Sequence, residues 1–171
     1  MSVVNVQLKS SLLDAAIKAS VKKKKYILLV DDDPAIRQVL LHLLTEEGYV
    51  VLLAANGVEA VEFVSARQFD LVLLDLNMPL KDGWETFENL SSENPLLPII
   101  VITARSNQLF PAVASGVGAL MEKPLDLPKL LSTIRELLEE PAEVRRARMA
   151  GRTSEFHYIP PKANASDRRA S

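Results

Sequence analysis

Carboxylate side chains follow two apolar runs of this sequence, at the places where the runs end. The aspartate triplet 31–33 comes directly after residues 26–30, and Asp75 comes directly after residues 71–74. Runs this short, apolar throughout and rich in branched residues predict strands that are buried on both faces, as in a parallel sheet. Such strands end at the rim where ligands of open α/β folds bind. The two carboxylate clusters are therefore expected to converge on one small site.

Carboxylates held close together repel one another, by roughly 4 kcal/mol per pair at ~4 Å in a medium of effective dielectric ~20. A divalent cation relieves this repulsion, and oxygen ligands favour magnesium or calcium. Asp33 precedes Pro34, which suits the first position of a helix, so we assign Asp33 to capping that helix. Asp31 and Asp32 are then left for chemistry together with Asp75.

Two further polar side chains fall at ends of predicted strands, Thr103 and Lys123. Each alone has a plain structural explanation, but four such positions on one rim indicate a shared site. The chemistry that these residue types support is phosphoryl transfer, in which a carboxylate attacks phosphorus and becomes an aspartyl phosphate. The transfer requires positive charge near the phosphoryl oxygens, which Lys123 and a bound magnesium would supply, while the Thr103 hydroxyl donates a hydrogen bond. Asp75 is the predicted nucleophile, because its strand is the most central and the loop after it is rich in turn signals.

The elements that must position these side chains alternate regularly between residues 26 and 140. The predicted strands are 26–30, 49–54, 70–75, 98–103 and 118–122, and the predicted helices are 34–47, 57–67, 84–92, a weak segment near 107–115, and 126–139. This alternation indicates an α/β domain with a parallel sheet covered by helices on both faces.

Charge divides the chain into three parts. Residues 1–25 form a basic extension of net charge +5, in which 7–19 could form a short helix. Residues 26–140 carry −11, and residues 141–171 carry +4. We expect this last part to be a disordered tail, apart from a possible helical continuation through Met149. The basic tails could contact nucleic acid, an acidic partner or the domain itself, or only aid solubility.

Composition excludes several classes of protein. The chain of 171 residues has no cysteine and two histidines, which excludes disulfides, thiolate metal sites and histidine-based metal sites. No apolar stretch approaches the ~20 residues of a membrane span. The N-terminal lysines follow the weakly apolar part, unlike a secretory signal. We therefore expect a soluble, cytoplasmic protein, and the residues after 140 are too few for a DNA-binding domain.

Four ordered motifs in the region 26–140 resemble the successive signatures of receiver domains of bacterial two-component response regulators. They are ILLVDDDPAIR at 27–37, FDLVLLDLNMPLKDGWE at 69–85, PIIVITAR at 98–105 and EKPLD at 122–126. The resemblance implies a flavodoxin-like (βα)5 fold with strand order 2-1-3-4-5. It also implies a single-domain response regulator that takes a phosphoryl group on Asp75 from a sensor histidine kinase, a phosphotransfer protein or a small phosphodonor.

The resemblance also assigns a Mg²⁺ site. By motif position, Asp32 and Asp75 would bind magnesium with their carboxylates, Asn77 with its backbone carbonyl, and Asp31 through water. The chemistry of the chain itself would be limited to magnesium-dependent self-phosphorylation and self-dephosphorylation at Asp75.

Two more roles follow from the same motifs. Thr103 and Lys123 would hold the phosphoryl oxygens, and the bond between Lys123 and Pro124 would be cis.

The sequence departs from the family pattern on one face. Leu120 stands where the family usually has the aromatic switch residue, and Pro111 lies within the fourth helical segment, which we expect to be short or displaced. One alternative is thus an adaptor that keeps the receiver fold but signals without phosphorylation. Another is a haloacid-dehalogenase-type phosphatase, but Ala35 stands where that family has Thr or Val.

Overall fold

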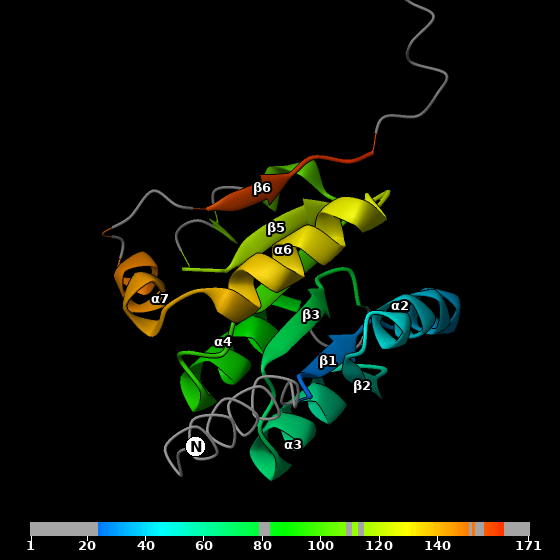
Figure 1. Ribbon diagram of the computed structural model, residues 1–171, viewed down its shortest axis with the longest axis horizontal. Coiled ribbons are helices and arrows are strands. Elements are labelled where there is room, and N and C mark those ends of the chain that lie inside the picture. Colours follow the sequence, from blue (N-terminus) through cyan, green and yellow to red (C-terminus); the bar gives the residue numbers. More distant parts are fainter. Residues whose placement is uncertain are drawn as a thin grey trace, which may run out of the picture.

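Six parallel strands form one sheet in the order β2-β1-β3-β4-β5-β6 (Figure 1). The computed structural model describes residues 24–78, 83–108, 111–112, 115–150, 152 and 156–162. The strands are β1 (Tyr26–Val30), β2 (Val50–Ala54), β3 (Leu71–Asp75), β4 (Ile99–Thr103), β5 (Ala119–Glu122) and β6 (His157–Ile159). The helices are α2 (Pro34–Glu46), α3 (Gly57–Ala66), α4 (Gly83–Glu93), α6 (Leu127–Glu139), α7 (Ala142–Met149) and the short 3₁₀ helix η1 (Ser106–Gln108).

The apolar residues of the strands supply two cores, one on each face of the sheet. On one face Leu40 and Leu44 of α2 and Ile134 of α6 pack against alternate strand residues. On the other face Ala60 of α3 and Phe87 of α4 pack against the intervening strand residues. Every residue of β3 and β4 is buried, as expected for inner strands with both faces covered by helices.

The sequence predicted this architecture closely. The first five strands begin and end within one residue of their predicted bounds, and the expected strand order 2-1-3-4-5 of a flavodoxin-like fold is confirmed. Asp33 caps α2 as predicted, since its side chain accepts hydrogen bonds from the backbone N–H groups of Ala35 and Ile36, and Pro34 follows at the start of the helix.

The part of the chain after residue 140 departs from the prediction. The helix α7 ends at Met149, in agreement with the possible helical continuation through that residue. The strand β6 was not predicted, and it adds a sixth strand beside β5 (Figure 1). The prediction of a disordered tail is therefore wrong for residues 157–159. The physical reason is burial: Ile159 is 7% exposed and packs into the core beneath α6.

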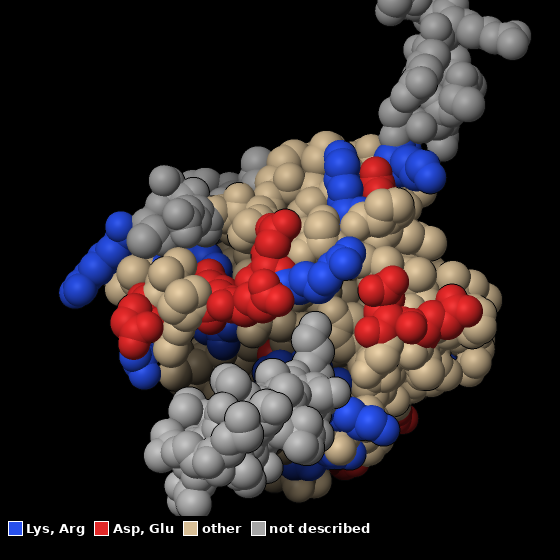
Figure 2. Space-filling view, in the orientation of Figure 1, with Lys and Arg blue, Asp and Glu red and all other residues tan. Residues whose placement is uncertain are grey.

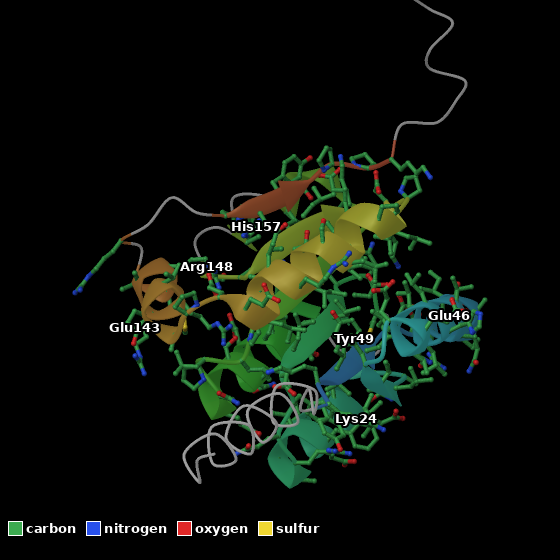
Figure 3. The ribbon with its side chains drawn as sticks, in the orientation of Figure 1. Lys24, Glu46, Tyr49, Glu143, Arg148 and His157 are labelled. Atoms are coloured by element: carbon green, nitrogen blue, oxygen red, sulfur yellow. The ribbon has the colours of Figure 1, made fainter. Side chains whose placement is uncertain are left out.

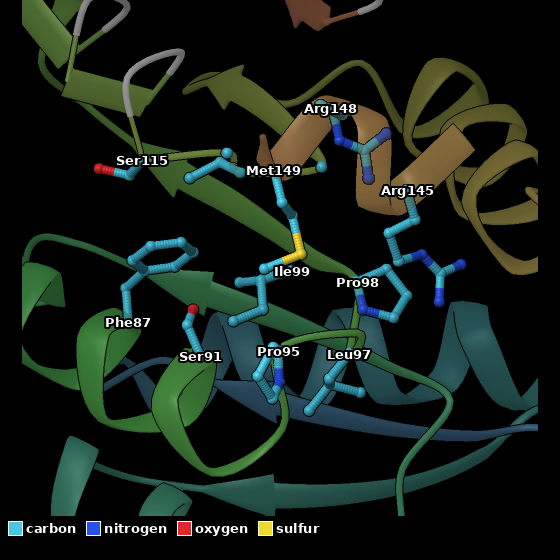
Figure 4. Close-up of a pocket in the computed structure, with 13 residues that line it drawn as sticks. Phe87, Ser91, Pro95, Leu97, Pro98, Ile99, Ser115, Arg145, Arg148 and Met149 are labelled. Atoms are coloured by element: carbon cyan, nitrogen blue, oxygen red, sulfur yellow. The ribbon is translucent and has the colours of Figure 1, made fainter. Parts of the chain in front are cut away.

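Ionic contacts fix α7 at the end of the sheet where the strands begin. Glu140 accepts hydrogen bonds from Arg145 and Arg148, and Arg148 is itself 6% exposed. Arg145 also donates to the backbone carbonyls of Leu96 and Leu137, at 2.6 and 2.8 Å. Figure 4 shows both arginines extending from α7, with Arg145 beside Pro98, the residue before β4.

Charged side chains of both signs lie on the face formed by α6 and α7 (Figure 2). Figure 3 labels Glu143 and Arg148 on α7 and His157 on β6. Glu143 is exposed and pairs with Arg146 at 3.8 Å, whereas Arg148 points into the protein. Exposed ion pairs of this kind contribute little to stability, so the anchoring of α7 depends on the buried contacts of Glu140.

Two predictions fall wholly or partly outside the described residues. The proposed helix at 7–19 lies outside them. Between β4 and β5 the structure describes η1 and a helical conformation at Pro111 and Ala112, with residues 109–110 and 113–114 outside the described parts. Among the described residues, no helix is long and apolar enough to cross a membrane.

Candidate functional site

Three carboxylates meet at the rim where β1 and β3 end. Asp31 follows the last residue of β1, and Asp75 is the last residue of β3. Asp31 is 1% exposed and Asp75 is 2% exposed, while Asp32 is exposed to solvent. One oxygen from each of these three carboxylates lies within 4.8 Å of the others. The adjacent parallel strands β1 and β3 thus bring together side chains that are far apart in the sequence.

Lys123 lies against this cluster from the end of β5. Its Nζ is 2.7 Å from Asp75 Oδ2 and 3.3 Å from Asp31 Oδ2. Burial disfavours the charged ammonium, but the hydrogen bond and charge of Asp75 outweigh it, so the pKa of Lys123 is raised. Burial raises the pKa of Asp31 as well, against the lowering effect of the Asp33 N–H and of Lys123. The Lys123 ammonium thus contacts two of the three carboxylates, and the Arg37 guanidinium donates to the Asp31 backbone carbonyl.

Asn77 and Thr103 complete the site. The Asn77 backbone N–H donates to Asp75 Oδ1 at 2.9 Å, which fixes the loop after β3 to the central carboxylate. The Thr103 hydroxyl, fully buried at the end of β4, donates to the side-chain oxygen of Asn77 at 3.0 Å. The sequence predicted a role for the Asn77 carbonyl but not this side-chain contact with Thr103, which only the spatial neighbourhood of the two strand ends can reveal.

The structure brings all six predicted site residues to one rim: Asp31, Asp32, Asp75, Asn77, Thr103 and Lys123. The bond between Lys123 and Pro124 is cis, as the resemblance implied. The donor set also fits a hard divalent cation, because it offers carboxylate oxygens and excess negative charge in a partly buried position. The arrangement can hold a cation beside a carboxylate that is itself in contact with an ammonium.

The altered switch face lies next to this site. Leu120 is fully buried in β5, in the core on the α4 side of the sheet. Its partner in the register of β5 and β6 is Tyr158, which is 41% exposed. The sequence contained no strong signal for this pairing, because three residues are too few to show a strand period.

The sequence matches the family described as response regulator receiver domain over residues 27–135. Among curated relatives, the transcriptional regulatory protein ZraR of Klebsiella oxytoca is 42% identical over 114 residues, which cover 66% of this chain and 26% of that protein. The response regulator MprA of Mycobacterium ulcerans is 40% identical over 114 residues, covering 66% of this chain and 49% of that protein. The chain thus aligns with only a quarter to a half of the length of these relatives.

Solved structures agree with the sequence matches. A CheY-like response regulator receiver domain protein from Methanospirillum hungatei JF-1 has a TM-score of 0.67 and 31% identity, and the match covers 71% of this chain and 98% of that chain. The response regulator protein TrrA of Thermotoga maritima, solved in complex with Mg²⁺ and BeF, has a TM-score of 0.62 and 33% identity, covering 66% and 98%. With its fold, its acidic rim and these matches, the chain belongs to the receiver domain family of two-component response regulators.

Proposed function

We propose that this chain is a phosphorylatable receiver that accepts a phosphoryl group on Asp75 in two-component signal transduction. The contact that carries the proposal is the 2.7 Å approach of Lys123 Nζ to Asp75 Oδ2, within a cluster of three carboxylates. A nucleophilic carboxylate beside a fixed ammonium is suited to phosphoryl transfer, because the positive charge stabilises the oxygens of the transferred group.

The chemical step forms one bond and breaks one. A carboxylate oxygen of Asp75 attacks the phosphorus of a donor phosphohistidine, the new P–O bond forms, and the P–N bond to the departing imidazole breaks. Lys123 holds one phosphoryl oxygen, and the Thr103 hydroxyl turns from Asn77 to donate to another. A second reaction at the same site, attack of water on the phosphorus of the aspartyl phosphate, would break the bond to Asp75, release inorganic phosphate and give the expected self-dephosphorylation.

We further propose that the site binds Mg²⁺ through Asp32 and Asp75, the Asn77 backbone carbonyl and, by way of water, Asp31. Bound magnesium would supply positive charge to the transferred group. The clustered oxygens of Asp31, Asp32 and Asp75 support a magnesium site, because magnesium prefers carboxylate ligands. The burial of Asp31 and Asp75 supports it as well, because uncompensated buried charge is costly. The ammonium of Lys123 compensates only part of this negative charge.

A sensor histidine kinase or a phosphotransfer protein is the proposed donor. An apolar groove lies beside the acidic rim, lined by Ile36, Val39, Leu40, Pro124, Leu125 and Leu127, with Lys123 at its edge. Val39 is 58% exposed, so part of the apolar lining of this groove is open to solvent. Such a groove suits the apolar face of an amphipathic helix, on which a phosphohistidine could be carried toward Asp75.

That the receiver acts without a DNA-binding output domain stays a prediction, and so does a cytoplasmic location. The curated relatives are longer than the aligned region, and their names describe a transcriptional regulatory protein and a response regulator. Pull-down of the protein expressed from its full gene, with mass measurement of the intact chain, would test whether an output domain accompanies the receiver.

Intact-mass spectrometry tests the phosphoacceptor. Incubation with acetyl phosphate and magnesium should add one phosphoryl mass to the native protein, and hydroxylamine should remove it. Asp75→Asn should remain unlabelled. Asp33→Asn is the matched control, because asparagine also caps helices and Asp33 is occupied with α2, so this variant should be labelled like the native chain. Undiminished labelling of Asp75→Asn would refute the assignment, and no labelling of the native chain would favour the phosphorylation-independent adaptor.

A further inference from the structure

The segment that begins with β6 contacts the residues on both sides of Lys123. The Tyr158 hydroxyl donates a hydrogen bond to Glu122 Oε1 at 2.9 Å. The Lys162 backbone N–H donates to the Pro124 carbonyl at 2.9 Å. Residues 122 and 124 are therefore both attached to the C-terminal segment, while the residue between them reaches the phosphoacceptor carboxylate.

The segment that begins with β6 is itself held by β5 and α6, so its contacts can hold residues 122 and 124 in place. β6 pairs in parallel with β5, and Ile159 is buried beneath α6. On the same face as Ile159, His157 Nδ1 lies 3.4 Å from Glu136 Oε2 of α6 (Figure 3). Tyr158 points to the opposite face, where it meets Glu122. The strand thus contacts α6 with one face and the end of β5 with the other.

The buried Glu122 carboxylate needs the hydrogen bond that Tyr158 donates. Glu122 is 6% exposed, and a buried carboxylate requires hydrogen-bond donors. The hydrogen bond to Glu122 also raises the pKa of the Tyr158 phenol, because the carboxylate favours the protonated, donating form. A phenylalanine would preserve the ring and remove only this donor.

We propose that β6 positions the phosphoryl-transfer site and that Tyr158 is a positioning residue, which acts through the strand end that carries Lys123. The Lys123 backbone N–H donates to the Thr103 carbonyl at 2.8 Å, so the residues that hold the phosphoryl group in the proposed function share one local framework. Transfer rates depend steeply on such placement, since a shift of about 1 Å can cost about 100-fold. This inference rests on the proposed function.

The central experiment compares Tyr158→Phe with the native protein at saturating magnesium. Intact-mass kinetics with acetyl phosphate should show phosphorylation of Asp75 slowed by roughly three- to tenfold, a fraction of the effect of full misplacement. His157→Gln is the matched control, because it changes the neighbouring side chain on the other face of the same strand, and its rate should equal that of the native chain.

Magnesium affinity separates positioning from general loosening of the fold. The Lys123 ammonium pairs with Asp75 and Asp31 and so competes with magnesium for these carboxylates. Its displacement should leave magnesium affinity unchanged or make it tighter, so calorimetric titration should show that Tyr158→Phe binds magnesium no more weakly than the native protein. A lower rate together with weaker magnesium binding would instead show a general structural defect and overturn the proposal. Equal rates for Tyr158→Phe and native protein would overturn it as well.

A measurement without phosphorylation distinguishes failure of this inference from failure of the proposed function. NMR-detected exchange of the Lys123 amide hydrogen should be faster in Tyr158→Phe than in the native protein or in His157→Gln. If this exchange is faster but the native chain takes up no phosphoryl group, the positioning role stands and the phosphoacceptor assignment fails. If the native chain is labelled normally and exchange of the Lys123 amide is the same in Tyr158→Phe as in the native protein, the phosphoacceptor assignment stands and the positioning role fails.

Discussion

Two buried ionic clusters lie at opposite ends of the sheet, and they differ in their balance of charge. At the rim where the strands end, the carboxylates of Asp31, Asp32 and Asp75 lie together, and the Lys123 ammonium contacts two of them, Asp31 and Asp75. At the other end, the single carboxylate of Glu140 faces two guanidinium groups. The first cluster has negative charge in excess, and the second has its carboxylate fully paired.

The cluster around Glu140 also has hydrogen-bond partners on the backbone of neighbouring elements. Arg145 also binds backbone carbonyls, including that of Leu137 in the last turn of α6, where the helix dipole favours positive charge. The Glu140 carboxylate is thereby paired by groups of the protein itself and serves to fix α7, although Arg148 Nε is buried without a hydrogen-bond partner in the part of the chain that the structure describes. Among the described residues, the acidic rim keeps an excess of carboxylates, which is the basis of the proposed magnesium site. Burial of charge thus fixes a helix in one place and, in the proposed function, prepares a cation site in the other.

The largest expected effect on the free energy of unfolding comes from breaking the cluster around Glu140. Glu140→Ala leaves Arg148 buried without its carboxylate and should lower the free energy of unfolding by about 3–5 kcal/mol in urea titration. The control is Glu143→Ala on the same helix, whose side chain is 82% exposed and should cost less than about 1 kcal/mol. Equal effects of the two substitutions would show that the buried cluster does not anchor α7.

Magnesium should act on the other cluster alone. At a concentration roughly 100-fold above its dissociation constant, it should stabilise the native protein by about 2.7 kcal/mol, measured as a rise in the thermal midpoint. Asp32→Ala should lose most of this response, whereas Glu140→Ala should keep it. Loss of the magnesium response in the Glu140 variant would mean that the two ends of the sheet are coupled.

Without magnesium, neutralising Asp31 should stabilise the protein. Burial raises the pKa of Asp31 above its ordinary 3.8, so the folded state binds this proton more readily than the unfolded chain, and the ionised group opposes folding at neutral pH. Asp31→Asn should therefore gain about 1 kcal/mol at pH 7 in urea titration. The gain should shrink as the pH falls and Asp31 itself becomes protonated. A gain that grows on acidification would contradict the sign of this shift.

The smallest effect is expected at the switch face. Leu120 has no hydroxyl to exchange between solvent and interior, and it is already fully buried beneath the pairing with β6. Binding of beryllofluoride, a phosphoryl mimic, should therefore change amide exchange only modestly in peptides that cover 115–122. Large protection changes there would show that this face responds as in relatives with an aromatic switch residue.

Local sequence was sufficient to predict the rim of the site. Each functional residue follows a run whose apolar character already defines a buried strand, and parallel strands end at the same edge. Asp33 could be separated from Asp31 and Asp32 because Pro34 specifies the start of a helix. Five of the six site residues could thus be gathered without knowledge of any long-range contact, whereas Asn77 was assigned only through the resemblance to receiver domains.

The C-terminal part could not be predicted in this way. β6 has three residues, and its stability depends on Ile159 entering a core that residues of α6 and β5 build. The two prolines that follow favoured an interpretation as disorder. The contact between Thr103 and Asn77 was missed for a related reason, since it depends on the distance between two strand ends rather than on either segment.

The brevity of β6 has a consequence for self-association of the protein. A strand edge with free N–H and C=O groups invites pairing with another molecule, and short edge strands that end in proline resist it. β6 covers the edge of β5 and is followed at once by Pro160 and Pro161, both exposed. Removal of residues 157–159 would uncover β5 along an apolar segment and make the protein prone to aggregate.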